Sequence, residues 1–428
     1  MNRHRIRGSG LFAAIAAAAV VTSPASADVG VGPSVNSASG NAVIEWDINT
    51  QNAVIAAGPF VPHAALLNWA IVQGAVYDAV NGIVRTHQPY LVQVASNPGD
   101  SQDAAAATAA YRVLVNLYPA QVDTLQSEYN ASLAAIPDGP AKQGGISDGE
   151  QAAAAMITAR QNDGRNSDFT IVIGTQPGQW RPTPPDFGLD PAPWAGNVRP
   201  FLIPSAAALR SDGPNALTSG QYAMDVNEVK SVGSRTSTTR TPDQTDAAKW
   251  WALGPTAAPV EAMLRSLATG HGLSTADTAR LFAQVHLATA DALIVCHNDK
   301  YYWNFWRPIT AIREADTDGN PQTTPDPNWT PLLDTPPFPE HSSGHACHTS
   351  AWTHTLANFF GTDKVSFSGF NTATGTTRSF TSFSQALKEL IDARVWGGIH
   401  FRTADTQGAV LGNKVARYLK KNYFQPVQ

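Results

Sequence analysis

Helical periodicity is the feature that most limits what this chain can fold into. The segment 63-HAALLNWAIVQGAVYDAVNGI-83 is rich in alanine and places Leu67, Ile71 and Ala75 at helical spacing. Further helices are predicted at about 104–117, 120–136, 147–163, 218–231, 244–252, 257–269, 274–298, 343–360, 382–396 and 403–422. Strand patterns are few and short. The sequence therefore predicts an all-α fold, a helical bundle of two packed four-helix-bundle-like halves with little or no β-structure.

Some segments carry signals that start or interrupt these helices. The helix at 147–163 is expected to begin at Ser147, because Ser147 and Glu150 form a capping-box pattern. Residues 174–204 and 321–339 are rich in proline, which lacks a backbone donor and breaks helices. We expect these two stretches to be ordered loops.

The N-terminus has the pattern of a secretory signal peptide. Arginines at positions 3, 5 and 7 precede the apolar run 11–21, and 25-ASA-27 follows as a small-residue cleavage site. The run is too short to span a bilayer, and no later run is predicted to be long enough. We therefore expect cleavage after Ala27 and export, to the periplasm or outside the cell, of residues 28–428 as one all-α domain. An uncleaved N-terminal anchor is the alternative.

The net charge limits which partners the chain is expected to bind, and the cysteine count limits which disulfides it can form. The chain has 29 Lys and Arg residues against 34 Asp and Glu, a net charge of -5. This balance argues against nucleic acid or an anionic membrane as the main partner. Export permits a disulfide between the two cysteines, Cys296 and Cys347. Two buried free thiols are the alternative, and the sequence leaves both open.

Two cations stand out within the aromatic segment 300-KYYWNFWRPITAIR-313. Lys300 and Arg307 are separated by four aromatic residues, and an apolar setting requires a compensating anion for buried cations. Pro308 suits the first position of a helix, so Arg307 is expected at a helix start, where an oxyanion is favoured. The alternative is that both side chains pack their stems on the aromatic rings and extend their charged ends into solvent.

A second candidate lies in 340-EHSSGHACHTS-350. Ser343 and Gly344 precede an alanine-rich helix, and a hydroxyl beside a glycine N–H at a helix start forms an anion cradle. His345 falls in the first turn; ordinary capping by a serine is the alternative reading. The histidines at 341, 345 and 348 do not match any ordinary zinc spacing, so we expect His341 and His348 to be supporting residues.

A third candidate is 393-ARVWGGIHFRTAD-405. Arg394 ends an amphipathic helix, Gly397 and Gly398 break it, and His400 follows on a loop. Arg402 could pair with Asp405 at the surface. The three candidates together supply three cations, a serine hydroxyl, a glycine N–H and two histidines, a set suited to a tetrahedral or trigonal-bipyramidal oxyanion.

These three segments resemble the motifs of the vanadium haloperoxidase / type 2 phosphatidic acid phosphatase superfamily, K-x6-R-P, P-S-G-H and S-R-x5-H-x3-D. Lys300, Arg307 and Pro308 match the first motif in full. The segment 343-SGH-345 matches the second motif, with Ser342 in place of its proline.

Arg394 and His400 match the third motif, with Ala393 in place of serine and Asp405 one position late. Which acid orients His400 is therefore left open. The segments 68-NWAIVQGAVYDAVN-81 and 180-WRPTPP-185 are similar to the secreted bacterial haloperoxidase-like branch.

The resemblance implies a vanadate cofactor, with phosphate able to occupy the same site. Five positions would contact the equatorial oxygens of the anion, namely Lys300, Arg307, Ser343, Gly344 and Arg394. His400 would be the vanadium ligand, and His345 would be the acid or base at the opposite face. Peroxo-vanadate, polarised by Lys300, would oxidise halide with hydrogen peroxide, and an organic acceptor would take up the product. Phe338, seven residues before His345, is the candidate halide-pocket residue.

Two other functions fit the same residues. In a secreted acid phosphatase, His400 would attack the phosphorus of a phosphomonoester and form a phosphohistidine, while His345 would protonate the leaving alcohol. A non-catalytic oxyanion-binding protein is the third reading. The absence of predicted membrane spans favours the haloperoxidase reading over the lipid-phosphatase branch.

Overall fold

The computed structural model of the chain describes residues 40–58, 61–252 and 258–427. The predicted signal peptide lies outside these described residues. Residues 39–428 form one compact unit, and its regular structure consists almost entirely of helices. The predicted all-α class is confirmed.

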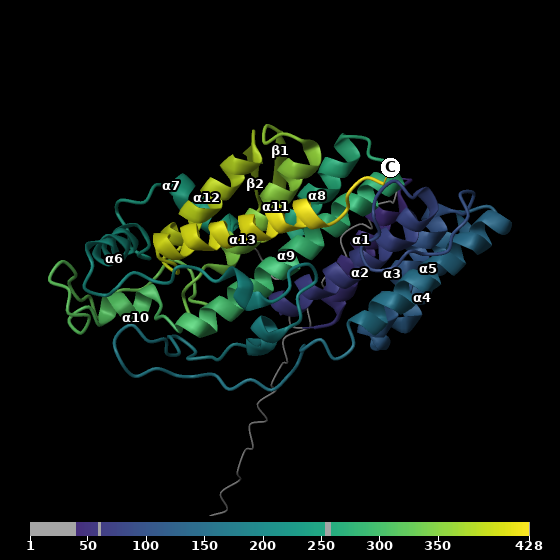
Figure 1. Cartoon of the computed structure of the whole chain (residues 1–428). Helices are drawn as coiled ribbons and strands as arrows, with labels where there is room; N and C mark the ends of the chain where they lie inside the picture. Colours follow the sequence, from purple (N-terminus) through teal and green to yellow (C-terminus); the bar gives the residue numbers. More distant parts are fainter. Residues whose placement is uncertain (1–39, 59–60, 253–257, 428) are drawn as a thin grey trace, which may run out of the picture. The chain divides into compact units, whose positions relative to one another are not determined.

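Five helices of the first 160 residues pack together, drawn in purple to blue in Figure 1; they are α1 (Ala42–Ala56), α2 (Pro62–Val84), α3 (Gln102–Leu117), α4 (Val122–Ala134) and α5 (Pro140–Ala159). Small residues allow α3 and α5 to approach closely. A Cβ atom on Gly149 of α5 would lie 2.5 Å from the Cβ of Thr108 in α3. The alanine-rich composition thus sets the spacing of these helices as well as their helical propensity.

The second half contributes α6 (Gly220–Val232), α7 (Pro242–Trp250), α8 (Ala258–Gly270), α9 (Thr275–Trp303), α10 (Pro308–Arg313), α11 (Gly344–Phe360), α12 (Phe383–Trp396) and α13 (Arg402–Asn422). The 29-residue α9 is the central element, because it packs against α2 from the first half and against α11 and α13 from the second. Lys300 lies in the last turn of α9, so this core helix places a charged side chain at the candidate site.

Among the described residues, α9 is also the one helix long and apolar enough to cross a membrane. The expectation that no segment after the N-terminal run reaches that length is therefore wrong. An 18-residue window of α9 passes the length and composition test, but 89% of it is buried inside the protein. Its apolar character is explained by its place in the core, where neighbouring helices cover it from several sides.

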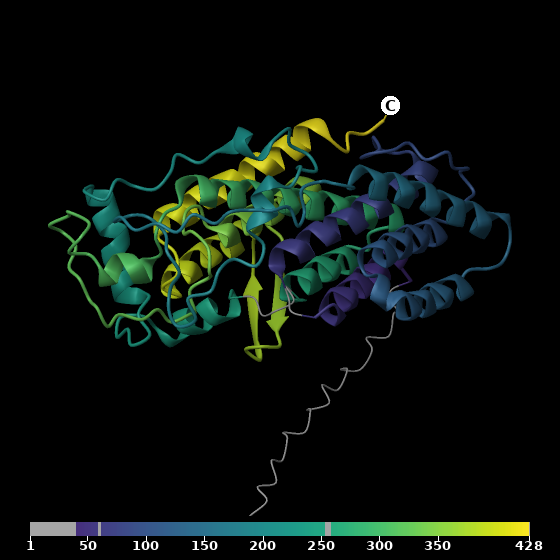
Figure 2. The same cartoon turned by 90° about the horizontal axis from the view of Figure 1, so that it is seen from below.

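The non-helical segments are short or proline-rich. A small antiparallel hairpin, β1 (Phe367–Asn371) and β2 (Thr376–Phe380), projects from the helices in Figure 2. Three short 3-10 helices complete the regular structure: Pro119–Gln121, Pro193–Asn197 and Ala206–Leu209. Both proline-rich stretches are ordered loops, as predicted, apart from the 3-10 turn at Pro193–Asn197. The carboxylate of Asp291 in α9 accepts hydrogen bonds from three consecutive N–H groups at 201–203 and thereby pins the first loop to the core.

Three predicted helix boundaries were wrong, one of them the end expected at 163, since α5 ends at Ala159, and one helix was missed. The helix expected to begin at Ser147 begins at Pro140, so Ser147 and Glu150 lie inside α5 and form no cap. Proline at the first helical position fixes the start, and the glycines that follow, which weaken helical propensity in the sequence, are required by close packing on α3. The helix expected to end at 298 continues to Trp303. Helix α1 had not been predicted.

Candidate active site

Lys300 lies in the last turn of α9 with a fully buried side chain. Its Nζ donates hydrogen bonds to the carbonyl oxygens of Pro339 at 3.1 Å, Glu340 at 3.0 Å and Ser342 at 2.6 Å. These bonds fix the loop that leads into α11. Burial lowers the pKa of Lys300 to about 8, because the apolar surroundings disfavour its charged form.

Two arginines lie in the same buried region, and each has one guanidinium nitrogen without a hydrogen-bond partner among the described residues. Arg307, at the start of α10 as predicted, donates from Nε to the carbonyl of Phe338 and from Nη1 to that of Ile399, both at 2.8 Å. Its Nη2 has no hydrogen-bond partner among the described residues. The same holds for Nε of Arg394, near the end of α12. Burial lowers the pKa of each arginine to about 10. Two buried donors therefore lack an acceptor, and a bound anion would supply one.

Helix α11 begins beside these cations. Ser343 is its N-cap residue, and its hydroxyl accepts a hydrogen bond from the N–H of Ala346. Gly344 is the first helical residue, and a Cβ atom at that position would lie 3.8 Å from Cε of Lys300. The partial positive charge of a helix N-terminus thus lies next to the buried lysine, as an oxyanion site requires.

The two histidines of the motifs differ in their surroundings. His345 is half-buried in the first turn of α11. Burial, reinforced by nearby Arg394, keeps the pKa of His345 well below its usual range, so the ring is neutral and able to accept a proton. His400 is fully buried on the loop after the Gly397–Gly398 break, and Gly398 has a φ of 76° that favours glycine.

Glu340 orients His400, a role that the sequence had left open. Its Oε1 lies 2.9 Å from Nδ1 of His400 and 2.9 Å from the N–H of Phe401. With its proton on Nδ1 donated to this carboxylate, the ring presents Nε2 as its acceptor nitrogen, and this Nε2 accepts a hydrogen bond from Nη1 of Arg307 at 3.2 Å. The clue available in the sequence was a single acid directly before the first histidine of the 341–348 cluster.

Asp405, the acid one position late in the third motif, is fully buried and does not contact Arg402. Burial raises the pKa of Asp405 to about 8, and the nearby hydroxyl of Ser343 opposes this shift. Arg402 pairs with Glu228 and Asp392. The alternative, a surface pair between Arg402 and Asp405, is therefore not formed, because Asp405 is fully buried while Arg402 is partly exposed and pairs elsewhere.

The ring of Phe338 contacts the two cations on one side and two buried histidines on another. Its ring centre lies 5.2 Å from Nζ of Lys300 and 5.0 Å from Cζ of Arg307. On another side it packs edge-on against His63 and His297. The ring is half-buried, so it combines an apolar face with close cations.

The side chain of His341 is hydrogen-bonded within the fold. Nε2 of His341 lies 3.1 Å from the hydroxyl of Ser211, which also bonds to Asp299. The three histidines of 341–348 do not converge: neither of the buried His/Asp/Glu trios with metal-site spacing in the described residues includes them.

Both cysteines are free and buried, so the disulfide alternative is wrong for this structure. The thiol of Cys296 donates to the carbonyl of Ser342 at 3.2 Å, directly behind the site.

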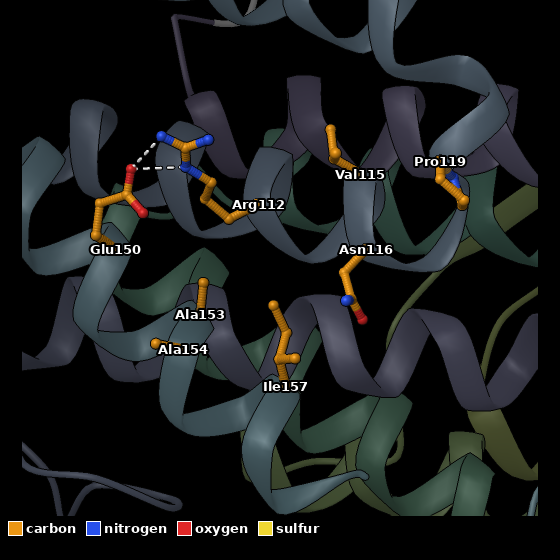
Figure 3. Close-up of a pocket in the computed structure, with 8 residues that line it drawn as sticks. All are labelled: Arg112, Val115, Asn116, Pro119, Glu150, Ala153, Ala154 and Ile157. Carbon is orange, nitrogen blue, oxygen red and sulfur yellow. Dashed lines mark hydrogen bonds and ion pairs between the residues drawn. The ribbon is translucent and has the colours of Figure 1, made fainter.

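A surface hollow on the N-terminal helices is separate from the motif residues. Figure 3 shows its lining, which comes from α3, α5 and Pro119 and is largely aliphatic. Its charged groups, Arg112 and Glu150, neutralise one another at 2.6 Å. The hollow contains no histidine, cysteine or unpaired acid, so we assign no chemistry to it.

Comparison with known proteins agrees with this geometry. A bacterial vanadium-dependent iodoperoxidase has the same fold, with a TM-score of 0.75 and 25% sequence identity over 90% of this chain and 97% of its own. Residues 280–428, which contain every motif residue, match the family described as the VCPO second helical-bundle domain. The family match, the curated relative and the solved structures together support the vanadium haloperoxidase superfamily.

Two further vanadium haloperoxidases match part of the sequence or the fold. Vanadium chloroperoxidase of Curvularia inaequalis is 40% identical over 84 residues, which is 17% of this chain and 13% of that protein. A bacterial vanadium-dependent chloroperoxidase, in its apo form, shares the fold with a TM-score of 0.68 at 18% identity over 85% of this chain and 93% of its own. The match to the curated relative thus spans only a small part of its length, whereas the fold is shared throughout.

Proposed function

We propose that this protein is a vanadate-dependent haloperoxidase-like enzyme that oxidises halide with hydrogen peroxide. The observation that carries the proposal is the pair of unpartnered buried donors, Nη2 of Arg307 and Nε of Arg394, beside Lys300 and the start of α11. Buried donors without acceptors are rare in folded proteins. A tetrahedral oxyanion provides acceptors for both, and its negative charge offsets the cluster of cations.

The donor set fits vanadate as well as phosphate. Lys300, Arg307 and Arg394 would hold the anion by their positive charge, and the hydroxyl of Ser343 and the N–H of Gly344 would be further donors to its oxygens. Nε2 of His400 would be the ligand nitrogen, because Nδ1 is bound to Glu340 and Nε2 is the acceptor side of the ring, where Arg307 now donates to it. When bound, vanadate supplies Lewis-acid activation of hydrogen peroxide without a change in its own oxidation state.

The chain's own residues have three tasks in this proposal. Neutral His345 accepts a proton from the incoming peroxide at the half-buried side of the site. Charged Lys300 stabilises negative charge that develops on the oxygen nearest to it. Phe338 keeps water from the cations and offers an apolar edge to the halide.

The test is a paired assay on one purified preparation, with and without vanadate. We expect bromination or iodination of a reporter dye that requires vanadate, peroxide and halide together. His400→Ala should abolish it, whereas His354→Gln, in the same helix as His345 but hydrogen-bonded to Ser350, should retain it. Stoichiometric vanadate binding without halogenation would contradict the proposal.

Release of phosphate from a phosphomonoester, inhibited by vanadate and lost in His400→Ala, would identify the enzyme as a phosphatase instead. Binding of phosphate without turnover in either assay would identify an oxyanion-binding protein.

We also propose that the enzyme is exported after removal of residues 1–27. The pattern of three arginines, an apolar run and 25-ASA-27 supports this proposal. N-terminal sequencing of the protein recovered outside the cytoplasm should begin at Asp28. A protein recovered there with an intact first residue would contradict it.

A further inference from the structure

A second polar cluster lies in the core, formed by residues outside the three motifs. Asp47 of α1, Glu261 of α8 and His286 of α9 bring their side chains together with exposed fractions of 0%, 4% and 1%. Their ligand atoms lie within 4.8 Å of one another. Helix α1 and the consecutive helices α8 and α9, distant from it in sequence, thus direct two carboxyl groups and an imidazole to one point.

The contacts inside this cluster are too long for hydrogen bonds. Nε2 of His286 lies 3.7 Å from Oδ1 of Asp47 and 3.5 Å from Oε2 of Glu261. Both Nε2 of His286 and Oε2 of Glu261 lack a partner among the described residues, although both are fully buried. Two facing buried atoms without partners indicate that a third species belongs between them.

The spacing suits a metal ion. Ligand atoms about 2.0–2.2 Å from a tetrahedral zinc ion are separated from one another by about 3.3–3.5 Å. The observed separations of 3.5 and 3.7 Å are close to that edge, so binding requires only a small movement of side chains.

Surrounding residues hold the carboxylate of Asp47 in place. Arg265 binds Oδ2 at 2.6 Å, and the amide of Gln73 donates to Oδ1 at 3.1 Å. Ligands in metal sites are commonly fixed by such outer hydrogen bonds. Arg265 is 14% exposed and therefore lies between the cluster and solvent, which gives an ion a short path inward.

We propose that Asp47, Glu261 and His286 form a binding site for a divalent transition-metal ion, zinc by its ligand types, that joins α1 and α8 to the central helix α9. Two carboxylates and one neutral imidazole provide three ligands, and water takes the fourth position. The site is separate from the vanadate site and depends on neither its occupancy nor the proposed activity.

A second buried trio, His63, Asp190 and His297, provides the matched control. There Asp190 and His297 already satisfy one another: Nε2 of His297 lies 2.9 Å from Oδ2 of Asp190, which also accepts from the hydroxyl of Tyr301 at 2.7 Å. Nδ1 of His63 is the one buried side-chain atom of this trio without a partner among the described residues. A metal would have to break the bonds to Asp190, so we expect no zinc at this trio.

The experiment uses the full untagged chain, stripped with a chelator and then titrated with zinc against a chromogenic competitor. We expect one equivalent of zinc per chain and a higher unfolding temperature in its presence. Glu261→Gln keeps the shape of the side chain but removes its charge, and it should bind zinc at least about 10-fold more weakly. Asp190→Asn should bind zinc as the wild type does.

Substitution of cobalt for zinc should give the visible absorption of a tetrahedral ion in the wild type and not in Glu261→Gln. Equal zinc affinity in the wild type and Glu261→Gln would overturn the proposal, as would a loss confined to Asp190→Asn. If Glu261→Gln does not fold, judged by its circular dichroism spectrum, Asp47→Asn replaces it in the same comparison, with the same two outcomes.

Discussion

Hydrogen bonds fix the ring of His400 from both sides, and Glu340 supplies the one that sets its tautomer. The family pattern suggested an aspartate after His400, but Asp405 lies one position late and has no hydrogen bond to the ring. Glu340 takes the role from 60 residues upstream. A spacing motif cannot reveal this partner, because the contact forms only when the loop before α11 meets the loop after α12.

Replacing Glu340 by glutamine tests the importance of that bond. Glu340→Gln keeps the size of the side chain but removes the charge that holds the proton on Nδ1. Loss of an outer partner of a metal ligand typically weakens binding or activity 10–100-fold, and we expect about that loss of vanadate affinity. Vanadate titration of apo-protein measures it. Glu150→Gln, at the exposed pair with Arg112, should leave the affinity unchanged; equal affinities for all three proteins would contradict the role of Glu340.

Lys300 makes oxyanion binding dependent on pH. Its pKa of about 8 means that the buried ammonium loses its charge as the pH rises through that value. We therefore expect phosphate affinity to fall between about pH 7 and 9, beyond the change due to the titration of phosphate itself. Lys300→Met should bind weakly at every pH and lack this additional fall. Equilibrium titrations of both proteins over this range check the difference, and parallel profiles would contradict it.

The same shift affects folding in a defined direction. Unfolded lysine keeps its proton up to about pH 10.4, whereas folded Lys300 loses it near pH 8. Between these values the unfolded state binds more protons, so the contribution of Lys300 to the free energy of unfolding rises with pH. Below about pH 8 the buried charge opposes folding in full.

At the scale of elements, the oxyanion site depends on how closely α13 packs against α11. Gly408 and Gly412 lie one turn apart on α13 and face the backbone of α11. A Cβ atom on Gly408 would lie 2.5 Å from the carbonyl oxygen of Ser343, and one on Gly412 would collide with that of Cys347. The two glycines therefore hold the N-terminus of α11 where it faces Lys300.

Gly408→Ala should destabilise the protein and weaken anion binding together. The new methyl group meets backbone atoms, so no side-chain rotation relieves the clash, and such overpacking lowers the free energy of unfolding by about 1–3 kcal/mol. Displacement of Ser343 should also reduce phosphate affinity. Denaturant unfolding and phosphate titration measure the two effects. Gly270→Ala, at the end of α8 with no atom within 4 Å of the new Cβ, should leave both unchanged or slightly raise stability.

The helices that the sequence predicted well are those whose own patterns define them. The predicted ranges 63–83 and 382–396 nearly coincide with α2 and α12, because long apolar periodicity and a following glycine pair mark them. The predicted start of α5 was wrong because the glycines before Ser147 lower helical propensity in the sequence. The reason for these glycines is close packing on a neighbouring helix, which the sequence does not reveal. Tertiary packing determined that boundary.

At the scale of the whole molecule, the motif residues from 300 to 400 converge although they come from four elements and two loops. Their order along the chain was enough to predict that these residues lie together, because each motif carries local chemistry; that they contact an anion stays a prediction. Glu340, the cluster of Asp47, Glu261 and His286, and the state of the cysteines were not predictable in this way. Each depends on contacts between segments distant in sequence, and no local pattern marks such contacts.

The cysteines lie on the two central helices, Cys296 on α9 and Cys347 on α11. Their thiols donate separately to carbonyl oxygens, that of Cys347 to Ala292 at 3.1 Å, so each is satisfied without a covalent bond. The core formed by α9 and α11 then needs no cross-link, and a reductant should leave the unfolding temperature unchanged. Thiol titration of the denatured, unreduced protein should find two free thiols per chain. A count of zero, with an unfolding temperature that falls in reductant, would show instead that a disulfide joins the two helices.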